Sequence, residues 1–319
     1  MGRYIIRRVL TAIPTLIAIS MVIFSILALA PGDPLSDLAL NPSVPPEVRQ
    51  RIRENLGLEE PIPVRYAKWA SSLFSGDFGY SFRTRGPVID LIKQRIPTTL
   101  YISGMAFLLA LLIAIPVGVL SAVKQYSVFD NVATTLAFIG FSLPTFAMGL
   151  LFILLFTIKL DWLPSIYRTT IDTEGFAGMW ERVRQAIMPI AVLGMAQAAT
   201  LMRFVRASML ENIHQDYVRT ARAKGLGEGT VIGRHALRNA LIPVVTIVAL
   251  ALPTVITGAV VTEQIFRVPG MGALLISSIQ NNDTPVVMTI TFLFSILVVA
   301  FNLLADIVYG VLDPRIKYS

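Results

Sequence analysis

Six stretches of the chain carry no charged side chain, and each is about as long as a membrane-spanning helix. A helix needs about 20 consecutive apolar residues to cross the hydrocarbon core of a bilayer. The stretches are Val9–Ala30, Ile96–Val123, Asn131–Ile158, Gln185–Met202, Asn239–Thr262 and Thr284–Ala305. The sequence therefore predicts an all-α polytopic membrane protein with six transmembrane helices.

The composition excludes several other classes of protein. Only 15% of the residues are charged, whereas a soluble globular chain has about 25%. The chain has no cysteine, so disulfide frameworks and thiolate metal sites are excluded. Its two histidines, His214 and His235, are too few and too far apart to indicate a metal site.

The first stretch is similar in two respects to a cleavable signal peptide. Arginines precede it, and Ala28-Leu29-Ala30 is similar to a small-residue cleavage site. However, its apolar run is longer than the usual signal-peptide core of about 7–15 residues. Pro31 would also follow the cut directly. We therefore expect a retained helix.

The lysines and arginines indicate the direction of the helices, because short cytoplasmic loops are enriched in basic residues. If the N-terminus is inside, the inner segments hold thirteen basic residues and the two short outer loops hold five. The segment Pro31–Arg95 is too long to count under this rule. Both termini are therefore predicted to be cytoplasmic. The net charge of +7 largely follows from this topology, so nucleic-acid binding is not needed to explain it.

The predicted spans lack the groups that drive many transporters. Ion-coupled transporters commonly place ionisable side chains within the membrane, and no span has one in its interior. A phosphate-binding G-x-x-x-x-G-K-[ST] motif is also absent, so any ATP must be bound by another chain. The polar residues in the spans either join helices or line a path for substrate. Candidates for the path are Ser142, Gln197, Thr200, Thr257 and Asn302.

The segment Arg203–Arg238 lies between the fourth and fifth spans. Good helix formers predict one helix over Met209–Lys224, Gly225 then breaks it, and a second helix leads toward Pro243. From the residues alone two interpretations remain open. The first helix either docks in a groove of a partner protein or lies on anionic lipid.

This segment resembles the EAA loop of binding-protein-dependent ABC importers, whose pattern is E-A-A-x-x-x-G. The pattern positions are occupied by Arg219, Thr220, Ala221 and Gly225. Two of the four residues depart from the pattern, but the phrases Tyr217–Leu226 and Arg234–Pro243 resemble the peptide-importer branch. In that family the loop forms a coupling helix that sits in a cleft of an ATPase subunit. The resemblance implies coupling roles for Tyr217, Arg219, Thr220, Ala221, Arg222, Ala223, Lys224, Gly225 and Leu226.

The resemblance continues along the whole chain, and it is to the first permease subunit of dipeptide and oligopeptide importers. The matching phrases are Leu29–Pro34, Gly76–Gly79, Trp162–Pro164, Phe266 with Pro269–Gly272, and Leu312–Ile316. It implies the type I ABC importer permease fold. It also implies a periplasmic gate, or scoop, at Phe266, Pro269, Gly270, Met271 and Gly272.

The resemblance further implies what the chain works with. Its partners are a homologous second permease, two ATPase subunits that bind ATP and Mg²⁺, an extracytoplasmic binding protein, and membrane lipid. The chain itself is then no enzyme and holds no cofactor, in a bacterial or archaeal cytoplasmic membrane. The expected substrate is a short peptide, with a nickel chelate or glutathione as alternatives. A stand-alone secondary transporter and a receptor or scaffold are the rival classes.

The chain divides into three predicted regions. They are 1–30 with the first span, the periplasmic segment 31–95, and the five-helix core 96–319 that includes the loop 203–238. The segment 31–95 either contributes to a docking surface for the binding protein or only covers the helix ends. In the last outer segment, Ala273–Ile279 is predicted to form one or two helical turns that dip between the helices.

Overall fold

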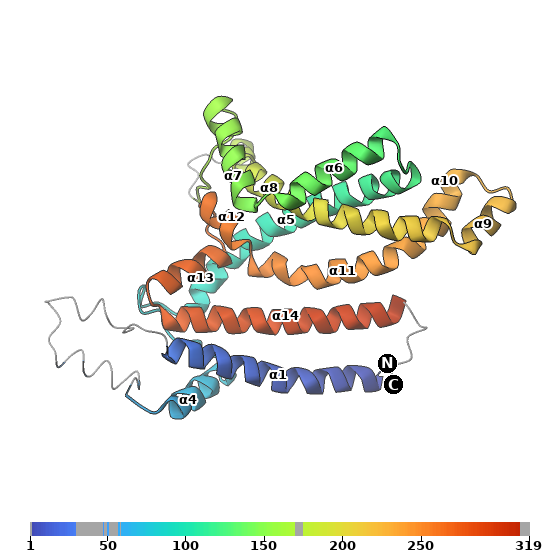
Figure 1. The fold of residues 1–319 in the computed structure, drawn as a ribbon. Coiled ribbons are helices and arrows are strands. Elements are labelled where there is room, and N and C mark those ends of the chain that lie inside the picture. The colour runs from blue at the N-terminus through green and yellow to red at the C-terminus, as the bar shows by residue number, and fades with distance from the viewer. Residues whose placement is uncertain are drawn as a thin grey trace. The chain divides into compact units, whose positions relative to one another are not determined.

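The computed structural model describes residues 2–29, 47, 50, 57, 59–169 and 175–312. Within these residues the regular elements are helices (Figure 1). An isolated antiparallel bridge joins Tyr80 and Pro87. The prediction of an all-α protein is therefore confirmed for this part of the chain. In the predicted segment 31–95, residues 31–58 lie outside the described residues, apart from residues 47, 50 and 57.

The helices follow one another along the chain in this order. They are α1 (Gly2–Leu29), α4 (Ile62–Phe74), α5 (Val88–Val123), α6 (Val128–Ser142), α7 (Thr145–Phe152), the π-helix η1 (Ile153–Lys159), α8 (Gly175–Ile213), α9 (Asp216–Ala223), α10 (Glu228–Thr230), the π-helix η2 (Val231–Ala236), α11 (Leu237–Thr257), α12 (Val260–Ile265), α13 (Met271–Gln280) and α14 (Thr284–Leu312).

Five of the described segments are long and apolar enough to cross a membrane. These are Ile6–Leu29, Val88–Val123, Gly175–Ile213, Glu228–Ile265 and Thr284–Ile307. A sixth candidate is the pair Val128–Ser142 and Thr145–Lys159, which is bent by 103°. The described residues therefore contain five candidate spans, or six when the bent pair counts as one.

The third predicted span, Asn131–Ile158, is not one continuous helix but two helices that meet at a sharp bend. Leu143 has extended backbone angles, φ −78° and ψ 124°, and Pro144 follows with φ −57° and ψ 137°. Proline has no N–H to donate, and it disfavours the helical conformation of the residue before it. Two successive extended residues therefore separate α6 from α7, whereas Pro189 lies within continuous α8.

The fourth span is longer than the charge-free stretch predicted. α8 has 39 residues and extends beyond Gln185–Met202 in both directions. Charged residues such as Glu181 and Arg206 lie within this helix, because helix formation does not require an apolar side chain at every position. Counting charge-free residues therefore located this helix but underestimated its length.

One of two compact units comprises residues 98–272 and 301 onward. In this unit α8 packs against α6, α7 and α11 (Figure 1). Alanines form much of one contact cluster, namely Ala110, Ala114, Ala137, Ala198 and Ala199. At Gly118 an added Cβ would lie 2.8 Å from the Val205 side chain, so α5 and α8 approach closely there. Small residues allow this approach of helix backbones, as is common in membrane proteins.

The other compact unit comprises residues 2–97 and 273–300. An aromatic cluster joins three of its helices: Phe24 of α1 contacts Tyr66 and Trp69 of α4, and Trp69 contacts Phe292 of α14. The hydroxyl groups of Ser20 and Tyr66 are hydrogen bonded at 2.9 Å. α1 is thus held by specific contacts with α4.

A second set of contacts in this unit surrounds Asp283, just before α14. Its buried carboxylate accepts hydrogen bonds from the Ser81 hydroxyl at 2.5 Å and the Phe82 N–H at 3.0 Å. The Thr289 hydroxyl donates to the Phe78 carbonyl at 3.3 Å. These bonds fasten the segment that precedes α5 to the start of α14.

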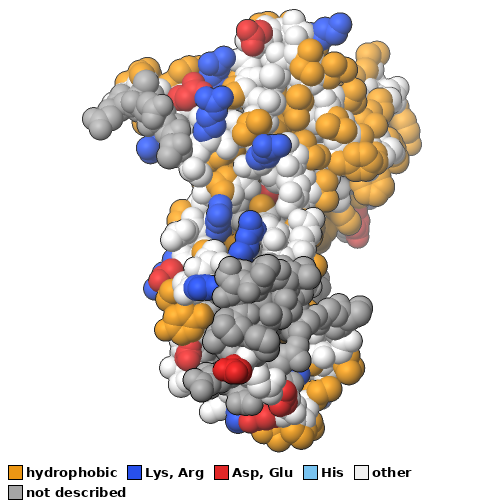
Figure 2. Space-filling view, turned by 90° about the vertical axis from the view of Figure 1, so that its left-hand side faces the viewer, with side chains coloured by type: hydrophobic (Ala, Val, Ile, Leu, Met, Phe, Trp, Pro, Cys, Tyr) orange, Lys and Arg blue, Asp and Glu red, His pale blue; other side chains and the backbone are white. Residues whose placement is uncertain are grey.

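The helices expose many large apolar side chains. On α1 these include Ile6, Leu10, Ile13, Ile17 and Ile26. Figure 2 shows hydrophobic side chains gathered in groups on one face of the molecule, with Lys and Arg side chains between the groups. A soluble monomer rarely exposes large continuous apolar patches. Lipid and partner helices are the surroundings that suit such surfaces.

Candidate functional site

The first candidate site is the segment around α9, between α8 and α11. α8 ends at Ile213, and the carbonyl of Gln215 accepts hydrogen bonds from the Val218 and Arg219 N–H groups, which starts α9. The single helix predicted over Met209–Lys224 is therefore two helices with a turn at His214 and Gln215. Asp216 lies in the first turn of α9, where a negative charge interacts favourably with the helix dipole.

One face of α9 is packed against the chain's own core. Val218 and Ala221 are buried in a cluster with Met209, Val231 and Ala240. Ala221 therefore faces inward. Its small side chain lets α9 pack closely against the helices behind it.

The other face of α9 is exposed. Tyr217 and Leu226 are 39% and 41% exposed, and the Arg219 side chain is 80% exposed. Thr220, Ala223 and Lys224 are also exposed. The exposed surface of α9 and the turn after it therefore has two apolar groups and cationic side chains. The opposite face of the helix is packed into the core.

The turn after α9 requires glycine. Gly225 has φ +78°, a left-handed conformation that a side chain disfavours. Its N–H donates to the Arg222 carbonyl at 2.9 Å, which ends the helix. The next helix begins at Glu228 after Gly227 and has no side-chain cap.

Arg222 is already paired within the chain. Its guanidinium lies 2.7 Å from the Glu228 carboxylate, across the glycine turn. The hydrogen bond to Glu228 raises the pKa of Arg222 above its ordinary value. Arg222 thus contributes to holding the turn, while Arg219 and Lys224 present their charges outward.

A partly buried ion pair lies in the same unit, and sequence reasoning missed it. The Arg206 guanidinium donates to both carboxylate oxygens of Asp130, at 2.7 and 2.8 Å. Asp130 also accepts hydrogen bonds from the Ser121 hydroxyl and the Tyr126 N–H. The pair joins α6 to α8, and its partners are 76 positions apart in the sequence, so no local pattern could have indicated it.

The second candidate site is the turn between α12 and α13, which holds the residues of the predicted gate. Phe266 and Met271 are buried in the same unit, and Phe266 packs in a cluster with Ile102, Met148 and Val268. α13 begins at Met271 and ends at Gln280. The short helix predicted over Ala273–Ile279 is therefore confirmed, and it begins two residues earlier than expected.

Glu263 organises this turn, and it too was missed from the sequence. Its carboxylate is buried and accepts a hydrogen bond from the Thr99 hydroxyl at 3.2 Å. The Met271 N–H in turn donates to the Thr99 Oγ1 at 2.8 Å. Gly270 lies against the same carboxylate, so that an added Cβ would collide with it. Glu263 and Thr99 thereby fix the start of α13 relative to α5.

We expect Gly270→Ala to destabilise this turn. The new methyl group has no room beside the Glu263 carboxylate, and overpacking of this kind costs about 1–3 kcal/mol. Thermal unfolding of the purified chain in detergent measures the loss. Gly104→Ala is the matched control, because its Cβ would meet Val255 at an ordinary 3.9 Å. Equal midpoints for the two variants would contradict the tight fit described here.

The candidates for the transport path lie on several helices of the first unit. Ser142 ends α6, Gln197 and Thr200 lie on α8, Thr257 ends α11, and Asn302 lies on α14. None of the five is fully buried. Their role in a path stays a prediction, as do the roles predicted for the residues of α9 and of the gate. Among the described residues, no group of three or more His, Cys, Asp or Glu side chains is placed to hold a metal ion.

Comparison with known proteins places the chain among transport components. Residues 114–318 match the family described as binding-protein-dependent transport system inner membrane component. Residues 1–103 match the corresponding N-terminal family.

Individual relatives are similar in sequence to this chain over its full length. The oligopeptide transport system permease protein AppB of Bacillus subtilis is 44% identical over 319 residues, which cover 100% of both chains. A probable peptide ABC transporter permease protein, y4tP, of Sinorhizobium fredii is 38% identical over 318 residues, with the same full coverage. The glutathione transport system permease protein GsiC of Escherichia coli strain K12 is 36% identical over 319 residues, again covering both chains fully.

A solved structure supports the fold. The crystal structure of an amino acid ABC transporter with histidines aligns with a TM-score of 0.53 at 11% identity, over 72% of this chain and 95% of that chain. With the family matches across residues 1–103 and 114–318, this chain belongs to the family of binding-protein-dependent transport system inner membrane components.

Proposed function

We propose that this chain is one of the two permease subunits of an ATP-driven importer for short peptides. The observation that carries the proposal is the geometry of α9, whose inner face is packed through Val218 and Ala221 while its outer face stays exposed. Because α9 is packed against α8 and α11, a movement of a partner docked on α9 is transmitted to these two helices. The substrate class rests on the relatives, which are named for oligopeptide, peptide and glutathione transport.

The orientation follows from the distribution of basic residues. We place the α9 end and both termini in the cytoplasm, and the α12–α13 turn outside, in the cytoplasmic membrane of a bacterium. The partners are a second permease, two ATPase subunits and an extracytoplasmic binding protein. The chain is a transport subunit and not an enzyme, and ATP hydrolysis belongs to the separate ATPase subunits.

The mechanism is a mechanical coupling without covalent chemistry in this chain. Closure of the ATPase pair on ATP moves the two coupling helices, one from each permease. Because α9 is packed against α8 and α11, its movement tilts these helices and opens the path toward the outside. The Glu263–Thr99 contact holds the start of α13 in place at the other end. Hydrolysis returns the helices to the inward-open arrangement.

Affinity purification of a tagged copy from its native membrane tests the proposal. We expect mass spectrometry to find a homologous permease and P-loop ATPases with the chain. The double variant Tyr217→Ala, Leu226→Ala removes one exposed apolar group on α9 and one just after it. It should retain the permease and lose most of the ATPase, because buried apolar side chains at the centre of an interface dominate its affinity.

The matched control is Phe176→Ala, Val183→Ala, which removes two exposed apolar groups near the other end of α8. This variant should retain the ATPases. Loss of the ATPases from the control, or their retention by the Tyr217 and Leu226 variant, would contradict docking at α9.

A further inference from the structure

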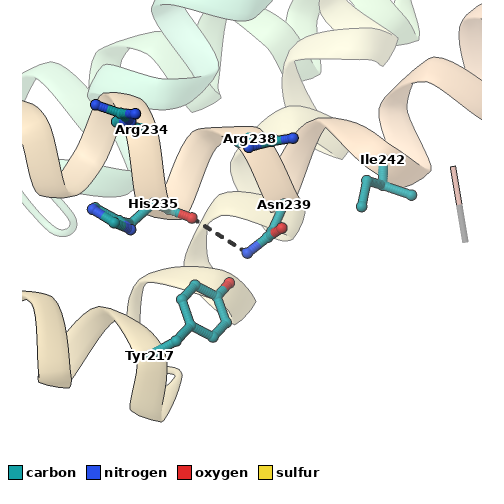
Figure 3. A pocket seen from close by; sticks show the side chains of 6 residues that line it. All are labelled: Tyr217, Arg234, His235, Arg238, Asn239 and Ile242. Atoms are coloured by element: carbon teal, nitrogen blue, oxygen red, sulfur yellow. Dashed lines mark hydrogen bonds between the residues drawn. The ribbon is translucent and has the colours of Figure 1, made fainter.

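A pocket of about 410 Å³ lies beside the coupling helix. Figure 3 shows the side chains that line it, Tyr217 from α9, Arg234 and His235 from η2, and Arg238, Asn239 and Ile242 from α11. Its size falls within the range of about 300–1,000 Å³ that is typical of small-molecule sites. All six residues belong to the same compact unit.

The pocket is positively charged and has no acidic lining residue. On α9, by contrast, Arg219 is paired with Asp216, and Arg222 with Glu228. Within the described part of the chain, Arg234 and Arg238 have no such carboxylate partner. Asn239 adds an amide, whose Nδ2 makes a long 3.4 Å hydrogen bond to the His235 carbonyl (Figure 3). The site therefore offers several hydrogen-bond donors to an anion.

The lining changes from polar to apolar in one direction along the chain. Arg234, Arg238 and Ile242 recur every four residues, which places them along one side of the η2–α11 segment. Beyond Ile242 the chain has no charged residue until Glu263. Val245 and Leu250 are exposed on the next turns of α11. The charged part of the pocket thus lies where the chain enters its membrane span.

We propose that this pocket binds the phosphate group of an anionic phospholipid. Arginine suits the purpose, because its planar guanidinium donates two hydrogen bonds to a phosphate at once. Basic pockets at the cytoplasmic ends of membrane helices are suited to acidic lipid headgroups. The acyl chains then continue past Ile242 along the apolar surface of α11. The bound lipid then contacts α9, η2 and α11 at once.

The change from charged to apolar residues along the pocket favours a lipid over other anions. A free phosphate ion gains nothing from Ile242, Val245 and Leu250. An acidic side chain of a soluble partner would have to reach a pocket that continues into the apolar span. The proposal requires that the chain spans a membrane, but it does not depend on the transport function, so either can fail without the other.

Lipid binding to the full-length chain alone tests the proposal. The chain in mild detergent is titrated with phosphatidylglycerol and separately with phosphatidylcholine, and bound lipid is counted by native mass spectrometry. We expect a saturable site that prefers phosphatidylglycerol. The double variant Arg234→Gln, Arg238→Gln should weaken that affinity at least about tenfold, because charge-assisted hydrogen bonds are lost. The matched control Arg219→Gln, Lys224→Gln removes the same charge outside the pocket and should bind as the unaltered chain does.

A third variant and a second probe separate the lipid from a free anion. Ile242→Gln removes the apolar rim and should weaken binding of phosphatidylglycerol while leaving any binding of inorganic phosphate unchanged. Thermal unfolding of each variant shows that it remains folded. Equal lipid affinity in all variants would overturn the proposal. So would tight binding of inorganic phosphate together with no preference for the anionic lipid, which would assign the pocket to a soluble anion.

Discussion

Asp130→Ala is expected to cause the largest loss of stability of any single change considered for this chain. Removal of the carboxylate leaves the partly buried Arg206 without its partner, and it also removes the acceptor for Ser121 and Tyr126. Breaking a buried pair costs about 3–5 kcal/mol. The lower end of that range applies here, because the Arg206 side chain is 22% exposed. Thermal unfolding in detergent should show a midpoint lower by several degrees.

Two further variants sharpen this test. Asp216→Ala breaks a pair with Arg219 that is almost fully exposed and removes one charge from the first turn of α9, so we expect a much smaller loss of stability than for Asp130→Ala. The double variant Asp130→Ala, Arg206→Met removes the unpaired charge and should regain part of the loss. A double variant that is less stable than Asp130→Ala alone would show that the two residues do not act as a pair.

Gly225→Val is expected to have the largest effect on coupling. The left-handed backbone at this position costs a residue with a side chain roughly 1–2 kcal/mol, and a β-branched residue is especially poorly suited to it. The strain is relieved by a shift of the turn that ends α9 and carries the Arg222–Glu228 pair. We expect ATP-dependent peptide uptake to fall at least about tenfold, while the protein level in the membrane stays unchanged.

Gly227→Val is the matched control for this prediction. Gly227 lies two residues further on in the same exposed turn, and an added Cβ would meet no atom within 4 Å at either glycine. Its backbone is extended, with φ −62° and ψ 143°, which valine adopts readily. Normal uptake by the Gly225 variant, or an equal loss in the Gly227 variant, would contradict a role for the left-handed turn.

The helices were largely predictable because lipid imposes a simple rule on the sequence. Backbone groups in the membrane must be satisfied within the helix, so an apolar run of sufficient length indicates a span. The rule located the cores of α1, α5, α8, α11 and α14. It could not distinguish Pro144, where a helix breaks, from Pro189, which lies within a continuous helix, since an apolar run surrounds both prolines.

The internal contacts of the two candidate sites were less predictable, because they join distant parts of the chain. Glycine after a run of helix formers indicated the end of α9, and the structure places Gly225 there with a positive φ. Ala221 faces the core and not a partner, a choice that depends on how α9 packs. Asp130 and Glu263 both lie just outside charge-free stretches, where an acidic residue is unremarkable in sequence, yet both are buried.

Uptake by reconstituted vesicles tests the central claim most directly. The chain is placed in proteoliposomes with its second permease and its ATPases, and the binding protein and a labelled oligopeptide are added on the opposite side. The account predicts uptake that requires ATP and the binding protein, and that continues when ionophores collapse proton and sodium gradients. Uptake by the chain without ATPases, driven by an ion gradient, would contradict it and assign the chain to the secondary transporters.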